Sequence, residues 1–437
     1  MKHIDRQILQ IALPSIVSNI TVPLLGLIDV AIVGHLGSPA YIGAIAVGGM
    51  LFNIIYWIFG FLRMGTSGMT SQAYGKRDLP EIVRLLMRSV GIGLAVALCL
   101  ILLQVPIRQA AFLIIHPTAE VREMATLYFH ICIWGAPAML GLYGLSGWFI
   151  GMQNSRIPMY IAITQNIVNI IASLSFVCFF KMKVEGVAFG TLIAQYAGFI
   201  MGLVLWMSRY GKLKKYILWK GVLQKEAMMR FFQVNRDIFL RTLCLVTVTL
   251  FFTSAGASQG EIILAVNTLL MQLFTLFSYV MDGFAYAGEA LSGRYIGARN
   301  RKAFTNTTRH LFIWGGWLAA FFTLVYALDG NAFLGLLTDN KDVVSPAGTY
   351  FYWALAIPVA GIAAFIWDGI FIGATATRGM LASMAIAAIS FFVVYYGLRP
   401  VLGNHALWLA FLVYLAMRGV VQTLLSPKII KENFTQP

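Results

Sequence analysis

Residues 7–34 read QILQIALPSIVSNITVPLLGLIDVAIVG and contain a single formal charge, Asp29. A helix needs roughly 20 apolar residues to cross a lipid bilayer, so this stretch is long enough for one crossing. The next formal charge in the chain is Arg63. The segment between Arg6 and Arg63 therefore predicts two membrane helices, which are separated at residues 35–39.

The composition of the whole chain extends this interpretation. Of its 437 residues, 59% are hydrophobic and 11% are charged, and the mean hydropathy is +0.79. A soluble domain usually carries about 25% charged residues. The composition therefore excludes a soluble enzyme, a disordered chain and a nucleic-acid-binding domain. The apolar runs are continuous instead of alternating, which argues against a transmembrane barrel.

Ten further uncharged runs follow the first two helices, and each is a candidate crossing. They lie at about residues 89–107, 124–150, 157–180, 186–208, 242–260, 262–281, 311–328, 347–367, 379–398 and 406–417. We therefore expect an all-α membrane protein with 12 transmembrane helices. Some of these helices should extend past the flanking charges into the lipid headgroups.

The placement of charge predicts the orientation. The 32 Lys and Arg residues outnumber the 17 Asp and Glu residues, for a net charge of +15. If the N-terminus is cytoplasmic, 23 of the basic residues fall in cytoplasmic segments and six on the opposite side. Such an excess follows the positive-inside rule. It predicts an integral protein of the plasma (inner) membrane with both termini cytoplasmic, and it requires no nucleic-acid partner.

The chain begins with a basic segment that also occurs in signal peptides. Lys2 and Arg6 precede the first apolar run, but no small-residue cleavage site follows a short apolar core. We therefore expect the run to be a retained membrane helix.

The sequence motifs of ATP-hydrolysing domains and of zinc metalloproteases are missing from the chain. The cysteines and histidines are scattered and predict neither a disulfide framework nor a certain metal site. The patterns G-x-x-x-x-G-K-[ST] and H-E-x-x-H do not occur. We expect no enzyme activity, no cofactor and no ATP hydrolysis within this chain.

The two halves of the chain resemble each other at a fixed offset of 222 residues. GWFIG at 147–151 matches GIFIG at 369–373, and Gly75 matches Gly297 at the same offset. We call positions related by this offset equivalent. Six helices per copy is an even number, so both copies enter the membrane in the same direction. We predict an N-lobe at 1–212, a linker at 213–233 and a C-lobe at 234–437, with a substrate site between the lobes.

Basic residues are concentrated at 209–235, where Trp219, Phe231 and Phe232 are interleaved with them. The simplest interpretation is a cytoplasmic linker that lies against anionic lipid. The alternative is a regulatory or lipid-sensing helix.

Polar side chains inside apolar runs are costly and usually functional. Asp29 lies deep in the first helix. On the fifth and sixth helices, neutral polar residues recur at helical spacing and share a face; they are Gln165, Asn166, Asn169, Ser173, Thr191 and Gln195. A carboxyl group removed from water binds a proton more readily, whereas clustered oxygens could hold Na⁺. A structural polar network that joins the helices is the alternative for each residue.

The second half holds its own intramembrane carboxylates. Asp282 and Glu289 share a helical face with Tyr286, and Asp368 stands in the sequence FIWDGIFIG. Asp282 and Glu289 either serve the function or pair with Arg294 or Arg241 to hold the bundle closed. For Asp368 the sequence favours neither alternative, a second functional carboxylate or a structural residue.

Two further features of the helices concern arginines and prolines. Arg63, Arg241 and Arg418 near span ends are expected to reach the headgroups. Pro14 and Pro23 lie on the helix of Asp29, where they predict either a static kink or a hinge that responds to protonation.

Four segments of the chain resemble the multidrug and toxic compound extrusion (MATE) family over nearly its whole length. They are LIDVAIVGHLG (27–37), SQAYGKRD (71–78), DGFAYAGEALSGRYIGARN (282–300) and FIGATATRGM (371–380), and the form DGFAYAGEA is similar to the DinF-like branch. The resemblance implies two six-helix lobes around a V-shaped cavity. It also implies antiport of organic cations or amphiphilic compounds against H⁺ or Na⁺.

The resemblance also implies roles for single residues. Asp29 matches the first-helix carboxylate, Pro14 the proline that bends that helix, and Asn169 and Thr191 cation-site positions. Ser173 stands where the branch usually has a second Asp, which weakens the case for Na⁺.

We therefore expect a monomeric, H⁺-coupled exporter that works by alternating access, with Asp29 as the main proton site. The cavity should include Gln165, Asn166 and Gln195. Small amphiphilic or cationic substrates and membrane lipids are the expected partners. The alternatives are Na⁺ coupling through Asp368, which resembles a cation-binding Asp of another branch, and a flippase for lipid-linked precursors.

Overall fold

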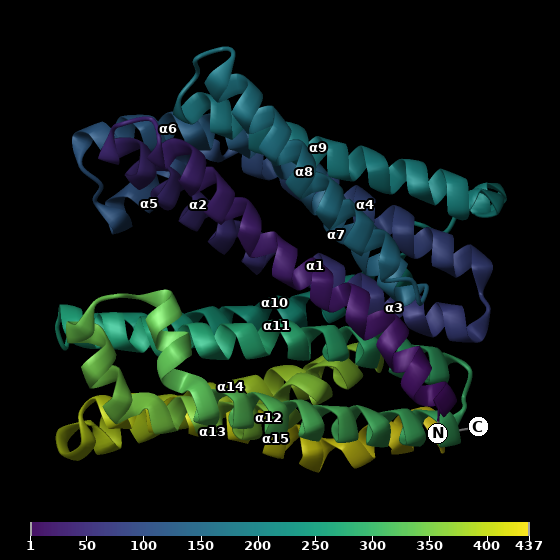
Figure 1. Ribbon diagram of the computed structural model, residues 1–437. Helices are drawn as coiled ribbons and strands as arrows, with labels where there is room; N and C mark the ends of the chain where they lie inside the picture. The colour runs from purple at the N-terminus through teal and green to yellow at the C-terminus, as the bar shows by residue number, and fades with distance from the viewer. Residues whose placement is uncertain (1, 436–437) are drawn as a thin grey trace. The chain divides into compact units, whose positions relative to one another are not determined.

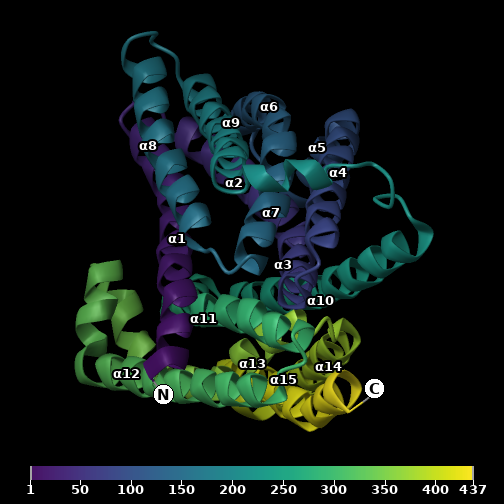
Figure 2. The same ribbon diagram turned by 90° about the vertical axis from the view of Figure 1, so that its right-hand side faces the viewer.

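The computed structural model describes residues 2–435, and these residues form helices without any strand (Figures 1 and 2). The first half contains α1 (Lys2–Gly34), α2 (Pro39–Ile58), α3 (Phe61–Lys76), α4 (Leu79–Leu102), α5 (Gln104–Ile115), α6 (Ala119–Cys132), η1 (Ile133–Gly135), α7 (Ala136–Gly151), α8 (Arg156–Cys178), α9 (Val184–Arg209) and η2 (Gly211–Tyr216). The second half contains α10 (Lys225–Ala257), α11 (Glu261–Gly297), α12 (Arg301–Leu337), α13 (Lys341–Gly373), α14 (Thr377–Leu402) and α15 (Asn404–Phe434).

Within residues 2–435, twelve helical segments are long and apolar enough to cross a membrane. Two of them join shorter helices, α2 with α3 and α6 with α7. The predicted number of crossings is confirmed, and the helices extend beyond the uncharged runs as expected. For example, α12 continues to Leu337, but its backbone leaves helical geometry at Asp329, next to the predicted end of that span.

The chain divides into two compact units. One unit comprises Val17–Asn235, and the other comprises the described residues before Val17 together with those from Arg236 onward. α1 therefore contributes its first part to the C-terminal unit and its remainder to the N-terminal unit. In the N-terminal unit α8 lies beside α9, and α7 lies against α3 and α4. In the C-terminal unit α13 packs against α11, α12 and α15.

The internal repeat is visible in the packing of each unit. A Cβ at Gly147 would overlap the backbone of Arg63, and a Cβ at Gly369 would overlap the backbone of Ala285. Gly147 is equivalent to Gly369, and Arg63 is equivalent to Ala285. α7 therefore approaches α3 at the same point of the repeat as α13 approaches α11. Glycine permits this close approach because it has no side chain.

The turns that end these helices repeat as well. Arg77 and Arg299 both have positive φ, at 57° and 53°, and so do Gln153 and Thr375, at 67° and 53°. The residue after each arginine then caps the next helix. Asp78 accepts a hydrogen bond from the Glu81 amide (3.3 Å), and Asn300 accepts one from the Ala303 amide (3.1 Å). Turns and caps at equivalent positions support an internal duplication.

Candidate functional site

Three helices of the N-terminal unit bring polar groups together around Asp29. Asp29 on α1 is 4% exposed, and Asn169 on α8 is fully buried. The Asn169 Nδ2 donates to Asp29 Oδ1 (3.0 Å), and the Thr191 hydroxyl on α9 donates to Asp29 Oδ2 (3.1 Å). Each carboxylate oxygen therefore has a neutral donor. We call these three residues, with Ser173, the Asp29 cluster.

Ser173 completes the cluster one helical turn along α8. Its hydroxyl donates to Asn169 Oδ1 (3.3 Å), and the Thr191 hydroxyl lies 3.4 Å from the same oxygen. A Cβ at Gly190 on α9 would overlap Ser173, so glycine allows α9 to approach α8 at this level. The structure thus brings together the four residues for which the sequence predicted a coupling role.

The Asp29 cluster contains no basic partner. All described interactions of Asp29 are with neutral side chains, and no Lys, Arg or His of residues 2–435 pairs with it. Tyr128 and Cys132 on α6 lie near enough to interact electrostatically with its charge. A buried carboxylate without a cation is costly to keep charged. Binding a proton or a cation would remove that cost.

The predicted cavity residues lie near the cluster on α8 and α9 but do not bond to Asp29. Asn166 Nδ2 donates to the carbonyl oxygens of Thr21 and Ala162 (both 3.1 Å), which joins α8 to α1. Gln165 packs against Gly198, and Gln195 against Gly135. Within the described residues, Asn166 Oδ1 and Gln195 Oε1 are buried without a hydrogen-bond partner.

Pro14 is buried on α1, in the part of the helix that belongs to the C-terminal unit. The helix is continuous through Pro14 and Pro23. Beside Pro14, the Ser15 hydroxyl donates to the Ile11 carbonyl (2.7 Å), and Gly283 of α11 packs against Ala12 and Ile16. The predicted hinge role of Pro14 stays a prediction.

Asp368 has entirely different surroundings, all within the C-terminal unit. The Nη2 atom of Arg241 on α10 lies 2.5 Å from Asp368 Oδ2, and Arg418 on α15 pairs with the same oxygen. Gln422 Nε2 donates to Oδ1 (2.7 Å). These four residues, which we call the Asp368 cluster, are at most 7% exposed. A Na⁺ ion at Asp368 would have to displace a guanidinium group.

The prediction that Arg241 and Arg418 reach the headgroups is therefore wrong. Both are buried, at 7% and 4% exposure, and both pair with Asp368. Their partner lies 127 and 50 residues away in sequence, so local sequence could not reveal it. The ion pair with Asp368 offsets part of the cost of burying each guanidinium group, so neither side chain has to reach the headgroups.

The other two candidate carboxylates of the second half, Asp282 and Glu289, lie on α11. Glu289 is buried at 1% exposure, and Asp282 is half-buried. Asp282 is near enough to Arg418 to attract its charge. For Asp282 and Glu289 alike, the two predicted alternatives, a functional group or an ion-pair partner, stay predictions. Among the described residues, no group of three or more His, Cys, Asp and Glu side chains could hold a metal ion.

Comparison with known proteins identifies the family. The MatE family model matches twice, at residues 14–174 and 238–398, which are the two copies of the repeat. The chain is 39% identical to DNA damage-inducible protein F of Escherichia coli (strain K12) over 420 residues, covering 95% of this chain and 90% of that protein. It is 22% identical to the probable multidrug resistance protein NorM of Synechococcus, over 92% of this chain and 88% of that protein.

Solved structures have the same fold. One is a MATE protein in the bent conformation, with a TM-score of 0.90 and 18% identity, covering 99% of this chain and 97% of that chain. Another is the Vibrio cholerae MATE transporter VcmN in the bent form, with a TM-score of 0.87 and 17% identity over 99% and 98% of the two chains. The chain belongs to the MatE family of multidrug and toxic compound transporters, and it is an integral membrane transporter, not an enzyme.

Proposed function

We propose that this transporter exports organic cations or other amphiphilic compounds in exchange for H⁺, by alternating access, with Asp29 as the main proton site. The observation that carries the proposal is the Asp29 cluster. Its carboxylate is 4% exposed, has hydrogen-bond donors on both oxygens and has no basic partner within the described residues. Such a group is stabilised by proton uptake.

The hydroxyl of Thr191 gives the cluster two hydrogen-bond arrangements. It lies 3.1 Å from Asp29 Oδ2 and 3.4 Å from Asn169 Oδ1. A hydroxyl has one proton to donate and can also accept. With Asp29 charged, Thr191 donates to Asp29. With Oδ2 protonated, Asp29 donates to Thr191, whose own proton turns to Asn169. The cluster thus accommodates both states without unsatisfied donors.

The transport cycle follows from these two states. Asp29 binds a proton when the site faces outward, and the substrate leaves. The protein then turns to face the cytoplasm, where substrate displaces the proton. Because α1 carries Asp29 and contributes residues to both units, we propose that it transmits the change by bending at Pro14.

Coupling to H⁺ is favoured over Na⁺ by the ligands available. The Asp29 cluster offers one carboxylate, and Ser173 supplies a hydroxyl where a second carboxylate would strengthen a cation site. The alternative Na⁺ site, Asp368, is already paired with Arg241 and Arg418. A flippase would be distinguished by lipid scrambling in vesicles without drug transport.

Efflux measurements on reconstituted protein test the proposal. A proton gradient should drive substrate efflux by the wild type, and Asp29→Asn should lose almost all of it while remaining folded. Asp342→Asn is the matched control, because it makes the same change at an exposed residue at the start of α13. Its efflux should equal that of the wild type. Normal efflux by Asp29→Asn would contradict the role of Asp29.

We also propose that both termini lie in the cytoplasm, as the 23 and six basic residues on the two sides indicate, and that the protein works as a monomer. In a cysteine-free background in whole cells, Lys341→Cys should react with an impermeant thiol reagent, and Lys220→Cys should not. The reverse pattern would contradict this orientation.

A further inference from the structure

The segment between α9 and α10 is basic and partly apolar. Residues 209–225 contain six Lys and Arg residues and no Asp or Glu. We call these residues the basic linker. Between the end of α9 at Arg209 and the start of α10 at Lys225, the described structure has one helical turn, η2, and residues 217–224 have no regular helix. The linker connects the end of one membrane span to the start of the next, so it lies close to the membrane surface.

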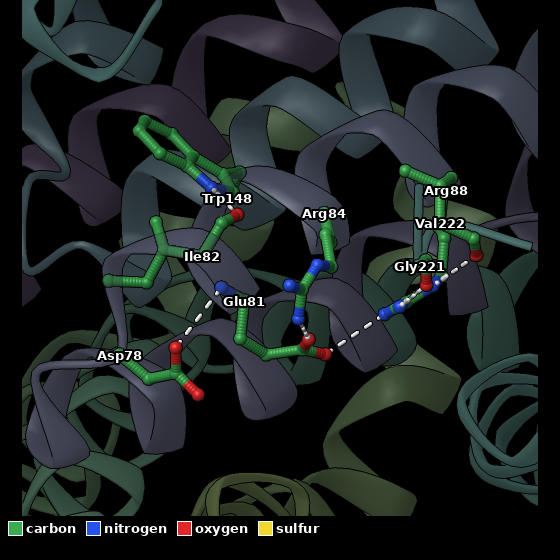
Figure 3. Close-up of polar contacts among 8 residues, drawn as sticks. All are labelled: Asp78, Glu81, Ile82, Arg84, Arg88, Trp148, Gly221 and Val222. Atoms are coloured by element: carbon green, nitrogen blue, oxygen red, sulfur yellow. Dashed lines mark hydrogen bonds and ion pairs between the residues drawn. The ribbon is translucent and has the colours of Figure 1, made fainter. Parts of the chain in front are cut away.

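A buried arginine fastens the basic linker to α4 (Figure 3). Arg88, only 3% exposed, donates from Nε to the Val222 carbonyl (2.8 Å) and from Nη2 to the Gly221 carbonyl (2.9 Å). Its Nη1 pairs with Glu81 (2.9 Å). The planar guanidinium group thereby holds two successive carbonyl groups in one geometry. Gly221 fits this turn because its φ is +89°.

Two apolar residues of the linker face inward and others face outward. Leu213 and Val222 are buried, at 9% and 2% exposure. In contrast, Leu218, Trp219 and Leu223 are 62%, 75% and 73% exposed. The fastened turn therefore presents large apolar side chains that the protein does not cover. Exposed apolar patches of this kind mark contact surfaces.

Lysines lie close in sequence to the exposed apolar residues. Lys212, Lys214, Lys215 and Lys220 are all exposed, and no linker carboxylate neutralises them. Trp is the residue that favours the headgroup level of a bilayer, and clustered lysines attract anionic lipid. Apolar groups and positive charge on one segment at the membrane surface match one partner, the surface of a bilayer that contains anionic lipid.

We propose that the basic linker is a membrane anchor, in which Arg88 holds Leu218, Trp219 and Leu223 in position to insert among the lipids. The four lysines then bind anionic headgroups. The anchor differs from an amphipathic surface helix, because its shape comes from the Arg88 contacts instead of from a helix. It goes beyond the proposed transport function and does not depend on which ion is coupled.

Quenching of Trp219 fluorescence tests the anchor without measuring transport. The full-length protein is reconstituted in phosphatidylcholine vesicles with and without phosphatidylglycerol, and lipids brominated on the acyl chain are added as quenchers. The difference between the wild type and Trp219→Phe isolates Trp219 from the other tryptophans. We expect quenching that is stronger with phosphatidylglycerol. A variant with Lys212, Lys214, Lys215 and Lys220 changed to Gln should lose the phosphatidylglycerol-dependent part.

Two results would overturn the proposal. Equal quenching of Trp219 in the two lipid mixtures would remove the anionic lipid as the partner. Absence of quenching, together with full access to a water-soluble quencher, would show that the linker does not insert. As a control, Lys428→Gln with Lys431→Gln changes basic residues outside the linker and should leave the quenching of Trp219 unchanged.

Discussion

The Asp29 cluster and its counterpart in the other half of the repeat have opposite chemistry. The positions equivalent to Asp29, Asn169 and Ser173 are occupied by Phe251, Phe391 and Tyr395. The Phe251 ring centroid is 5.9 Å from that of Phe391 and 5.3 Å from that of Tyr395. The pair Asp29–Asn169 and the equivalent pair Phe251–Phe391 thus meet in both units, through a hydrogen bond in one and an aromatic contact in the other.

The comparison also works in the opposite direction. The positions equivalent to Asp368, Arg241 and Arg418 are occupied by Ser146, Asn19 and Tyr196. The ion pairs of the C-terminal unit therefore have no charged counterpart in the N-terminal unit. The two halves share their glycine contacts and turns. Their polar clusters, however, lie at different positions of the repeat. One unit has a carboxylate without a basic partner among the described residues, which we propose as the proton site, and the other has a carboxylate paired with two arginines.

The largest effect on stability should come from Asp368, where charge is paired. Asp368→Asn leaves two buried guanidinium groups without their carboxylate, and removing one partner of a buried pair costs about 3–5 kcal/mol. We expect a large fall in the melting temperature of the purified protein. The protein that does fold should keep H⁺-driven efflux without requiring Na⁺. A Na⁺ requirement that disappears in this variant would contradict the assignment of Asp368 as structural.

The shared packing of the two halves predicts a smaller, symmetric effect. Gly147→Ala and Gly369→Ala each place a Cβ against backbone atoms, and overpacking of this kind costs about 1–3 kcal/mol. Both should lower the melting temperature by similar amounts. Gly91→Ala and Gly316→Ala are matched controls, because a Cβ there meets no atom within 4 Å. Unequal effects of Gly147→Ala and Gly369→Ala would argue against equivalent packing.

The smallest effect should be on the Na⁺ dependence of efflux, when a second carboxylate is added to the Asp29 cluster. Ser173→Asp adds a second carboxylate beside Asn169, and carboxylate oxygens are ligands for hard cations. We expect a modest stimulation of efflux by Na⁺ that the wild type lacks. Tyr395→Asp is the control at the equivalent position of the other half and should give no Na⁺ response. Equal Na⁺ responses in the wild type and Ser173→Asp would contradict the role given to Ser173.

The sequence predicted the spans and the repeat because both depend on hydropathy and on short motifs that are local in the chain. The grouping of Asn169 and Ser173 was predictable too, because residues four apart share a helical face. The pairing of Asp368 with Arg241 and Arg418, and the contacts of Arg88 with Gly221 and Val222, were not. These contacts join helices and loops far apart in sequence, and only tertiary packing determines which partner is reached.

The most direct test of the central claim is proton release from the purified protein when substrate binds. In weakly buffered detergent solution without Na⁺, substrate should release protons from the wild type and from Asp342→Asn. Asp29→Asn should release none, although it remains folded. Equal proton release by Asp29→Asn and the wild type would contradict Asp29 as the proton site.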